Sequence, residues 1–275
     1  MRSWVTAGRS LAVALVALCA LLSGGCRGGH DDTSVAASER KTPSFTRSAG
    51  GSYSAITVAN PGTVSGTVTI GGTLPEDTVV HPTSDVQVCG SELQDVTIDH
   101  DGPKLAGAVV WLDGVRSGKA LPLVKRYDVV NEGCIVTPRV QAAALGGTLN
   151  VRSRDPITHR TRILRPGVKE PVALVTETDE GQVVPLDRAL EAPGPLEIRC
   201  DLHPWTRGWV VVFDHPYYQV TGRDGSFSLD SVPPGDYTLH VWHERLGTIT
   251  RPVKIESGGA ARVQLDLRFD GTGKR

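Results

Sequence analysis

The chain has 275 residues, and its 29 lysines and arginines nearly balance its 30 aspartates and glutamates, which gives a formal net charge of −1. This balance excludes the basic footprint of a nucleic-acid-binding protein. Aromatic residues are few (5%), whereas glycine (31), proline (18), valine and threonine are abundant. Such a composition favours strands joined by turns, so we expect an all-β protein of one or two domains.

The N-terminal residues are typical of an export signal. Arg2 and Arg9 precede an apolar run over residues 11–22, which is too short to span a bilayer. Small residues at 23–25 then lead to Cys26, and this string, LLSGGC, resembles the lipobox of bacterial lipoproteins. The resemblance implies that Cys26 is lipidated after the signal is removed. Ordinary signal-peptidase cleavage, which would release a soluble protein, is the alternative.

The residues after this cysteine lack apolar periodicity. Residues 27–60 are rich in glycine, serine, threonine and charge, a composition that suits a flexible tether. We therefore expect a signal peptide over 1–25 and a lipid-anchored tether over 26–60. Two acyl chains would hold the protein at the membrane, in the cell envelope, on the periplasmic or outer-membrane face.

The exported part of the chain holds three cysteines, Cys89, Cys134 and Cys200. Outside the cytoplasm an odd count leaves one thiol unpaired or bound to something. Cys200 has His203 three residues further on, which favours it as the functional thiol. We therefore expect a disulfide between Cys89 and Cys134, with pairing of Cys200 to either of them as the alternative.

Short segments with strand character follow one another from Gly62 onward, separated by turn signals. A helical period is present only over 186–192. An antiparallel sandwich is the simplest way to bury a series of short strands of this kind. In the first part of the chain we expect strands at 64–70, 96–100, 106–115, 134–142 and 147–154.

A second β unit begins near Trp209, with strands expected at 209–215, 226–230, 238–244, 253–256 and 262–269. Within it, the string VTGRDGSFSLDSVPPGDYTLHVWHE resembles the carboxypeptidase regulatory-like, transthyretin-like (prealbumin-like) β-sandwich. The resemblance implies that Asp224-Gly225 turns a hairpin, that Phe227 fills the core and that Pro234-Gly235 makes a second turn. Such modules mostly act as scaffolds or binding units, so this part predicts no chemistry of its own.

The stretch CDLHPWT, residues 200–206, carries the residues best suited to chemistry. Cys200 and His203 offer a soft thiolate and an imidazole to one metal ion. In a straight strand, residues three apart lie roughly 10 Å from each other on opposite faces, so these ligands must lie on a loop. A third ligand must come from another strand. His159 is the candidate, because it follows a predicted strand and the turn at Asp155-Pro156.

Two strings around these ligands resemble the cupredoxins, the plastocyanin and azurin group. GTLNVRSRDPITH is similar to their strand, loop and first histidine, and CDLHPWT is similar to their C-x-x-H-x-x-M ligand loop. The resemblance implies a cupredoxin-like Greek-key sandwich over 61–208, followed by the smaller transthyretin-like sandwich over 209–270. It also implies a trigonal site for one copper ion, with His159, Cys200 and His203 as the equatorial ligands.

The axial position departs from the cupredoxin pattern, because Thr206 stands where methionine is usual. The chain has one methionine, Met1, which would leave with the signal. A carbonyl, a water, the Thr206 hydroxyl or no ligand would therefore take the axial place, and the axial ligand tunes the potential. Arg139, Arg160 and Arg162 would favour a thiolate or an anion over a cation, so a degenerate site is the competing interpretation.

We expect the copper to serve single-electron transfer to an unidentified redox partner protein. Copper storage or delivery uses the same ligands and is one alternative. A metal-free module that binds carbohydrate or protein is another, and its stacking surfaces would come from Trp111, Trp205, Trp209 and Trp242, although tryptophan at a module junction is more often core.

Catalysis is not expected. The chain has no G-x-S-x-G, no H-E-x-x-H and no phosphate-binding glycine loop, and His243-Glu244 is not followed by a second histidine. His215, His240 and His243 are interpreted as packing or surface residues. His240 and His243 lie three apart in a strand-like run, which places them on opposite faces.

Overall fold

The structure is a computed structural model that describes residues 52–72, 76 and 78–268. The predicted signal peptide, the lipidation site at Cys26 and most of the tether lie outside these residues. Within the described ranges, no helix combines the length and the apolar character needed to cross a bilayer. Nearly all regular elements there are strands, so the all-β prediction is confirmed.

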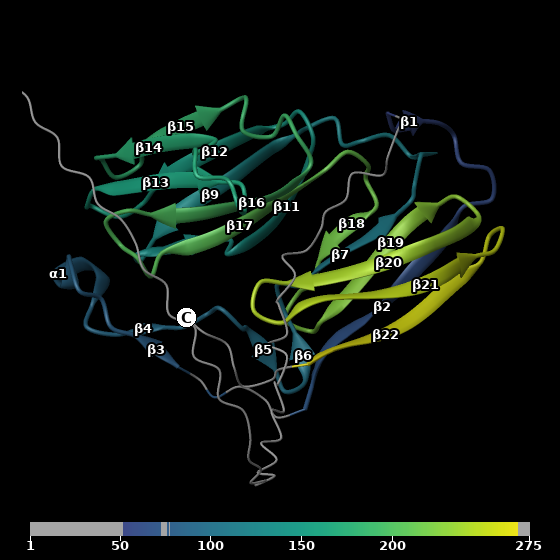
Figure 1. Ribbon diagram of the computed structural model, residues 1–275, viewed down its shortest axis with the longest axis horizontal. Helices are drawn as coiled ribbons and strands as arrows, with labels where there is room; N and C mark the ends of the chain where they lie inside the picture. Colours follow the sequence, from purple (N-terminus) through teal and green to yellow (C-terminus); the bar gives the residue numbers. More distant parts are fainter. Residues whose placement is uncertain (1–51, 73–75, 77, 269–275) are drawn as a thin grey trace, which may run out of the picture. The chain divides into compact units, whose positions relative to one another are not determined.

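One group of strands, named here the inserted sandwich, consists of two facing sheets (Figure 1). The first sheet has the order β10-β9-β12-β15 and the second β11-β17-β16-β13-β14. Both are mixed sheets, because β9 runs parallel to β12 and β11 runs parallel to β17. The strands are β9 (Arg126–Glu132), β10 (Ile135–Thr137), β11 (Val140–Ala144), β12 (Thr148–Ser153), β13 (His159–Leu164), β14 (Ala173–Glu177), β15 (Val183–Leu186), β16 (Gly194–Cys200) and β17 (Arg207–Phe213).

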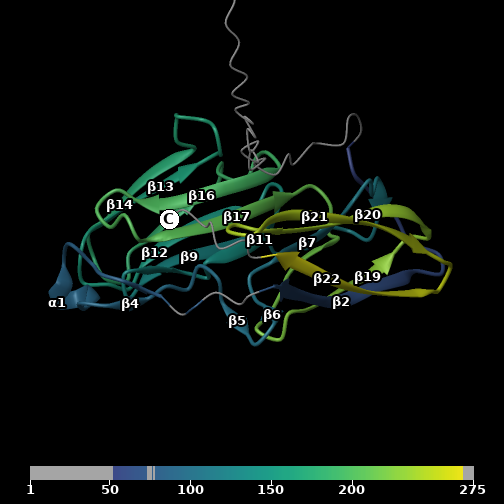
Figure 2. The same cartoon turned by 60° about the horizontal axis from the view of Figure 1, so that its bottom comes forward.

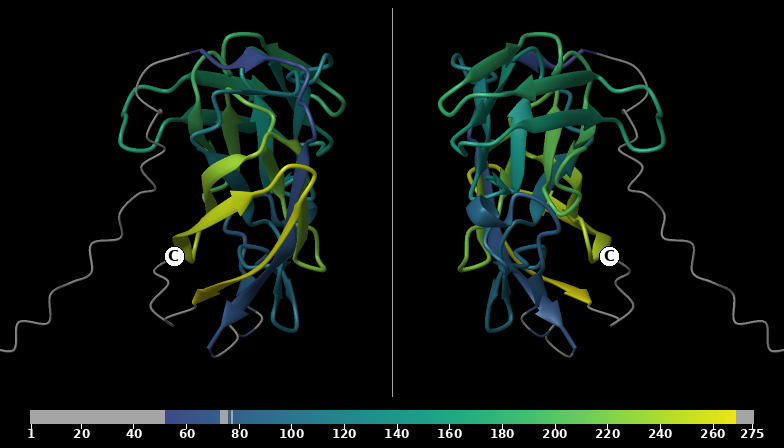
Figure 3. Two further views of the ribbon diagram at one scale, coloured as in Figure 1. Left: turned by 90° about the vertical axis from the view of Figure 1, so that its right-hand side faces the viewer. Right: turned by 90° about the vertical axis from the view of Figure 1, so that its left-hand side faces the viewer.

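A second group, named the terminal sandwich, contains strands from both ends of the described chain. One sheet has the order β18-β7-β20-β21, and the other has the order β19-β2-β6-β5 with β22 paired to β2. The first and last long strands, β2 and β22, lie side by side in parallel (Figure 3). The strands are β2 (Gly62–Gly71), β5 (His100–Asp101), β6 (Lys104–Leu105), β7 (Val109–Asp113), β18 (Tyr218–Val220), β19 (Ser226–Val232), β20 (Gly235–His243), β21 (Gly247–Ile255) and β22 (Ala260–Arg268).

This arrangement differs from the predicted boundaries at 61–208 and 209–270. Strands β2 and β7 were predicted to lie in the first domain. In the structure β2 pairs with β19 and β22, and β7 pairs with β18 and β20, so both belong to the terminal sandwich. Strand β17, which the predicted boundary cuts, pairs with β11 and β16 in the inserted sandwich. The prediction assumed that each sandwich is continuous in sequence, whereas β9 to β17 interrupt the terminal sandwich between β7 and β18.

The two sandwiches share an apolar contact made by strands that are buried on both faces. In β7, Val110 and Leu112 point into the core of the terminal sandwich, while Val109 and Trp111 join a cluster with β17 and β20. Alternate residues of a strand point to opposite faces, so near-continuous apolar runs such as VVWL and WVVVF are needed where both faces are covered. Figure 2 shows β11 and β17 beside β7. The shared cluster contains Val109, Trp111, Val211, Phe213 and Trp242.

The connection between β2 and β5 holds a short helix, α1 (Val86–Cys89), and a small hairpin of β3 (Val79–Val80) and β4 (Leu93–Gln94). A disulfide joins Cys89 at the end of α1 to Cys134, between β9 and β10. This is the pairing that the cysteine count favoured. A further pair of short strands, β1 (Ser54–Ala55) and β8 (Ser117–Gly118), runs in parallel.

The helical period noted over 186–192 does not form a helix in the described chain. Residues 187–190 form turns after β15, and Ala189 and Leu190 are buried in the core of the inserted sandwich. Pro185 and Pro193 confine the segment to fewer residues than a helix needs to propagate, so its apolar spacing reflects core contacts instead. The strand predicted over 96–100 is also shortened, because only His100–Asp101 pairs, as β5.

Candidate metal centre

The candidate ligands lie at one end of neighbouring strands in the inserted sandwich. His159 is the first residue of β13, Cys200 is the last residue of β16, and His203 follows in the loop before β17. In the antiparallel register Cys200 lies opposite Thr161, so the two share a face of the sheet. His159, two residues before Thr161, points to the same face. Strand pairing therefore brings His159 to the thiol from 41 residues away.

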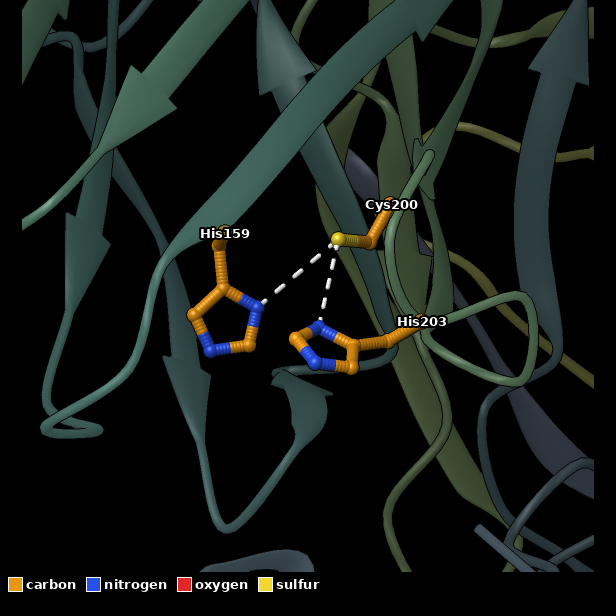
Figure 4. A group of neighbouring side chains, drawn as sticks. All are labelled: His159, Cys200 and His203. Carbon is orange, nitrogen blue, oxygen red and sulfur yellow. Dashed lines mark hydrogen bonds between the residues drawn. The ribbon is translucent and has the colours of Figure 1, made fainter. Parts of the chain in front are cut away.

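The three side chains converge on one point, as Figure 4 shows. Nδ1 of His203 lies 3.5 Å from Sγ of Cys200, and Nδ1 of His159 lies 3.9 Å from it. The three ligand atoms all lie within 4.8 Å of one another. Metal bonds of about 2.0 Å to nitrogen and about 2.3 Å to sulfur place each nitrogen about 3.5 to 3.7 Å from the sulfur in tetrahedral or trigonal geometry. The observed separations fit a shared ion.

Burial isolates the group from water. The side chains of His159 and His203 are fully buried, and Cys200 is 4% exposed. Cys200 is also the free cysteine among the described residues. Its Sγ accepts a hydrogen bond from the backbone N–H of Arg160 at 3.4 Å, a contact that favours negative charge on the sulfur.

Each imidazole is held by a carboxylate at the ring nitrogen that faces away from the sulfur. Nε2 of His159 lies 2.9 Å from Oδ2 of Asp155, and Nε2 of His203 lies 2.9 Å from Oδ2 of Asp85. A proton on Nε2 that is donated to the carboxylate leaves Nδ1 with a lone pair for a metal. Carboxylate–histidine pairs of this kind orient metal ligands and raise their basicity.

The disulfide connects these two carboxylates through the backbone. Asp155 accepts hydrogen bonds from the N–H groups of Gly133 and Cys134, at 2.6 Å and 3.0 Å. On the other side of the disulfide, the N–H of Cys89 donates to the carbonyl of Asp85. The Cys89–Cys134 bond therefore fixes the segment that carries Asp85 against the loop that binds Asp155.

The electrostatics of the metal-free group favour a thiolate beside a protonated imidazole. Burial raises the pKa of Cys200, but the hydrogen bond from His159 and the backbone N–H of Arg160 outweigh it and lower the pKa to about 7. Burial lowers the pKa of His159, but Asp155 and Cys200 raise it to about 9. Metal binding requires the sulfur deprotonated and the imidazole neutral, so binding releases the imidazole proton.

Thr206, the candidate axial residue, is buried and its hydroxyl is already engaged. The hydroxyl donates a hydrogen bond of 2.7 Å to the carbonyl of Cys134. Its backbone braces the ligand loop, because its N–H donates to the carbonyl of His203 and its carbonyl accepts from the N–H of Cys200. An axial role for this hydroxyl stays a prediction.

The three arginines expected to oppose a cation are each paired with a carboxylate. Arg139 forms an ion pair with Glu244 at 2.6 Å, and Arg162 forms one with Asp201 at 2.7 Å. Arg160 lies 3.6 Å from the same aspartate. Carboxylates thus accompany all three guanidinium groups, which weakens the charge argument for a degenerate site.

The remaining histidines singled out in the sequence lie outside the ligand group, whereas one of the tryptophans, Trp205, packs its ring against that of His203 with centroids 5.3 Å apart. His240 stacks on Trp111 with ring centroids 4.8 Å apart, and His215 and His243 are buried outside the ligand group. Trp111 and Trp242 are buried in the contact between the sandwiches, so they offer no stacking surface. Trp205 and Trp209 are half-buried and line a cavity.

A buried polar cluster adjoins the ligands and was not anticipated. Glu177 lies opposite His159 in the β13–β14 ladder and is fully buried. Its Oε1 accepts hydrogen bonds of 3.0 Å from Asn131 and from Thr161. Oε2 of Glu177 and Oδ1 of Asn131 are buried with no hydrogen-bond partner among the described residues. A proton on Glu177 would remove the charge of this buried carboxyl, and burial accordingly raises its pKa.

Comparisons with known proteins give partial similarities to copper proteins of known structure. No protein-family model matches the sequence, and a search of curated proteins finds no match. A copper-containing nitrite reductase from Thermus scotoductus is 22% identical over 34% of this chain, with a TM-score of 0.29. The chain spans 24% of that enzyme.

Two small cupredoxins are covered almost completely. A purple cupredoxin from Nitrosopumilus maritimus is 18% identical over 32% of this chain and 99% of its own, with a TM-score of 0.27. A variant of amicyanin is 17% identical over 38% of this chain and 98% of its own, with a TM-score of 0.28. The fold and the site together define an all-β protein with a buried two-histidine, one-cysteine group that is arranged as a metal centre.

Proposed function

We propose that this chain binds one copper ion through His159, Cys200 and His203 and serves single-electron transfer in the cell envelope. The observation that carries the proposal is the convergence of two imidazole Nδ1 atoms on one buried thiol, at 3.5 Å and 3.9 Å. A thiolate with two imidazoles in a trigonal set is the donor combination of copper electron-transfer sites.

The donor set supports copper over a structural zinc ion. Structural zinc sites are closed by four protein ligands. Among the described residues, the histidine, cysteine and carboxylate groups that converge here are three. The single methionine of the chain, Met1, lies outside the described residues, so no thioether from the described part takes the axial place.

The protein residues would hold the ion rigidly and keep water away. Asp85 and Asp155 orient the imidazoles, and the backbone N–H of Arg160 stabilises the thiolate. Copper, when bound, would supply a one-electron couple. A buried ligand set fixed by hydrogen bonds on both imidazoles needs little rearrangement when the charge of the ion changes.

The test is a titration of the metal-free protein with Cu(II), followed by visible absorption. The wild type and a His81→Gln variant, which removes an exposed histidine outside the group, should both develop an intense thiolate-to-copper band. Cys200→Ser should not. A colourless Cu(II) complex of the wild type would overturn the proposal. Tight Cu(I) binding without a reversible couple in voltammetry would favour storage or delivery instead.

The export and lipid anchor proposed from residues 1–26 require a separate test. In a bacterial host the full chain should partition into the detergent phase of a membrane extract and carry a diacylglyceryl mass on Cys26. Cys26→Ser should move it to the aqueous phase. Aqueous partition of the unaltered chain would contradict the anchor and leave the copper proposal standing.

A further inference from the structure

A cavity of about 340 Å³ lies beside the candidate metal centre and is not part of it. Its size falls within the range of small-molecule sites, about 300 to 1,000 Å³. The ring of Trp205, which lines the cavity, packs against the ring of His203 with centroids 5.3 Å apart. The lining includes the indoles of Trp205 and Trp209, the guanidinium of Arg207 and the aliphatic side chains of Val80, Leu93 and Ile135.

The acidic side chains in the lining are already supplied with donors. Glu244 accepts from Arg139 at 2.6 Å and from Nε1 of Trp209 at 2.8 Å. Glu197 accepts from Nε and Nη2 of Arg199, at 2.7 Å and 2.8 Å. Asp95, the third, accepts hydrogen bonds from Thr97 and Thr78. Glu244 and Glu197 thus have their charge offset by an arginine, whereas Asp95 is held by uncharged donors.

Arg207, a cation in the lining, is exposed and has no carboxylate partner. It donates from Nε to the carbonyl of Pro204, but no carboxylate of the described residues forms an ion pair with it. Its guanidinium can therefore pair with an anionic group of a ligand in the cavity.

We propose that this cavity binds a small planar aromatic carboxylate. The aromatic ring would pack against the indoles and the aliphatic residues, while the carboxylate would accept from the guanidinium of Arg207. The proposal goes beyond the copper site and does not depend on it, although the shared Trp205 ring places the ligand next to His203.

Calorimetry on the metal-free full chain tests the proposal with 2-naphthoate as the probe. We expect saturable one-to-one binding, much weaker binding of the neutral 2-naphthamide, and none of acetate, which lacks the ring. Arg207→Gln should weaken naphthoate binding about fivefold or more, since a charge-assisted hydrogen bond is lost. Arg251→Gln, which removes an exposed arginine of β21, should leave the affinity unchanged.

Trp205→Leu removes the indole ring from the lining and should also weaken binding, while circular dichroism verifies that the variant folds. Equal affinity for naphthoate and naphthamide, or an unchanged affinity of Arg207→Gln, would overturn the proposal, as would saturable binding of a neutral oligosaccharide in place of naphthoate. Because the protein is metal-free, these results are independent of the copper titration.

Discussion

Oδ2 of Asp85 lies 2.9 Å from Nε2 of His203, although the two residues are 118 positions apart in the sequence. Asp85 adopts a left-handed backbone conformation, with φ of 49°, just before α1. The disulfide at the end of α1 holds this segment over the ligand loop. The connection between β2 and β5 therefore completes the candidate metal centre from outside the sandwich that carries the ligands.

Asp85→Asn tests this contact. The amide can keep a hydrogen bond to His203 but not the negative charge beside its ring, so we expect metal affinity to fall about 10- to 100-fold. A competition titration with a chelator measures it. Asp230→Asn, which alters an aspartate paired with Lys119 in the terminal sandwich, is the matched control. Equal affinity in both variants would show that Asp85 does not support the ligand.

Removal of the disulfide should weaken both the fold and the site. The bond joins residues 45 positions apart, and a loop of that length corresponds to about 4 kcal/mol of stability in the chain-entropy description. We expect Cys89→Ser combined with Cys134→Ser to lower the free energy of unfolding of the metal-free protein by that order, measured in denaturant. Metal affinity should fall as well, because Asp85 is no longer fixed. A stability loss without any change in affinity would contradict the role given to the segment.

Glu177→Gln should change how stability depends on pH. The folded-state pKa of Glu177 is raised from 4.5, so the folded state binds the proton more tightly than the unfolded state does. The protonated carboxyl of Glu177 therefore stabilises the folded state fully at a pH below the pKa that Glu177 has in the unfolded state. This stabilisation is lost as the pH rises through the pKa that Glu177 has in the folded state. The variant should gain stability relative to the wild type over that interval. An exposed control, Glu170→Gln, should show a constant difference, and the same flat difference for Glu177→Gln would contradict the protonated cluster.

Thr206→Val separates an axial role from a structural one. The hydroxyl donates to the buried carbonyl of Cys134, so its loss should cost about 1 to 3 kcal/mol in the free energy of unfolding. We expect the visible band of the copper-loaded variant to keep its position, because the hydroxyl proton is directed to that carbonyl. A clear shift of the band, with unchanged stability, would instead show that the Thr206 oxygen contacts the metal.

The candidate ligands could be predicted from the sequence because their signals are local. Cys200 and His203 are three residues apart, and His159 follows a recognisable strand and turn. The role of Asp155 was harder to predict from the sequence, although Asp155 lies only four residues before His159 in the same turn. Asp85 has no local signal in the sequence, because only tertiary folding of the segment between β2 and β5 brings it to His203.

The all-β class could likewise be predicted, but the assignment of strands to sandwiches could not. Composition and alternation identify a strand such as Val109–Asp113 without stating which sheet it joins. Its four buried residues in succession indicate a strand that is covered on both faces. The apolar run is therefore the feature of the sequence that reflects the contact between the sandwiches. Pairing of β2 with β22 joins strands from near the two ends of the described chain and has no local signature.

Copper-edge X-ray absorption on the Cu(I)-loaded protein tests the central claim most directly. The account predicts one sulfur and two imidazole nitrogens as neighbours of the metal, with the sulfur lost in Cys200→Ser and one nitrogen lost in each of His159→Ala and His203→Ala. A first shell made only of nitrogen and oxygen, or one unchanged by these three substitutions, would contradict it.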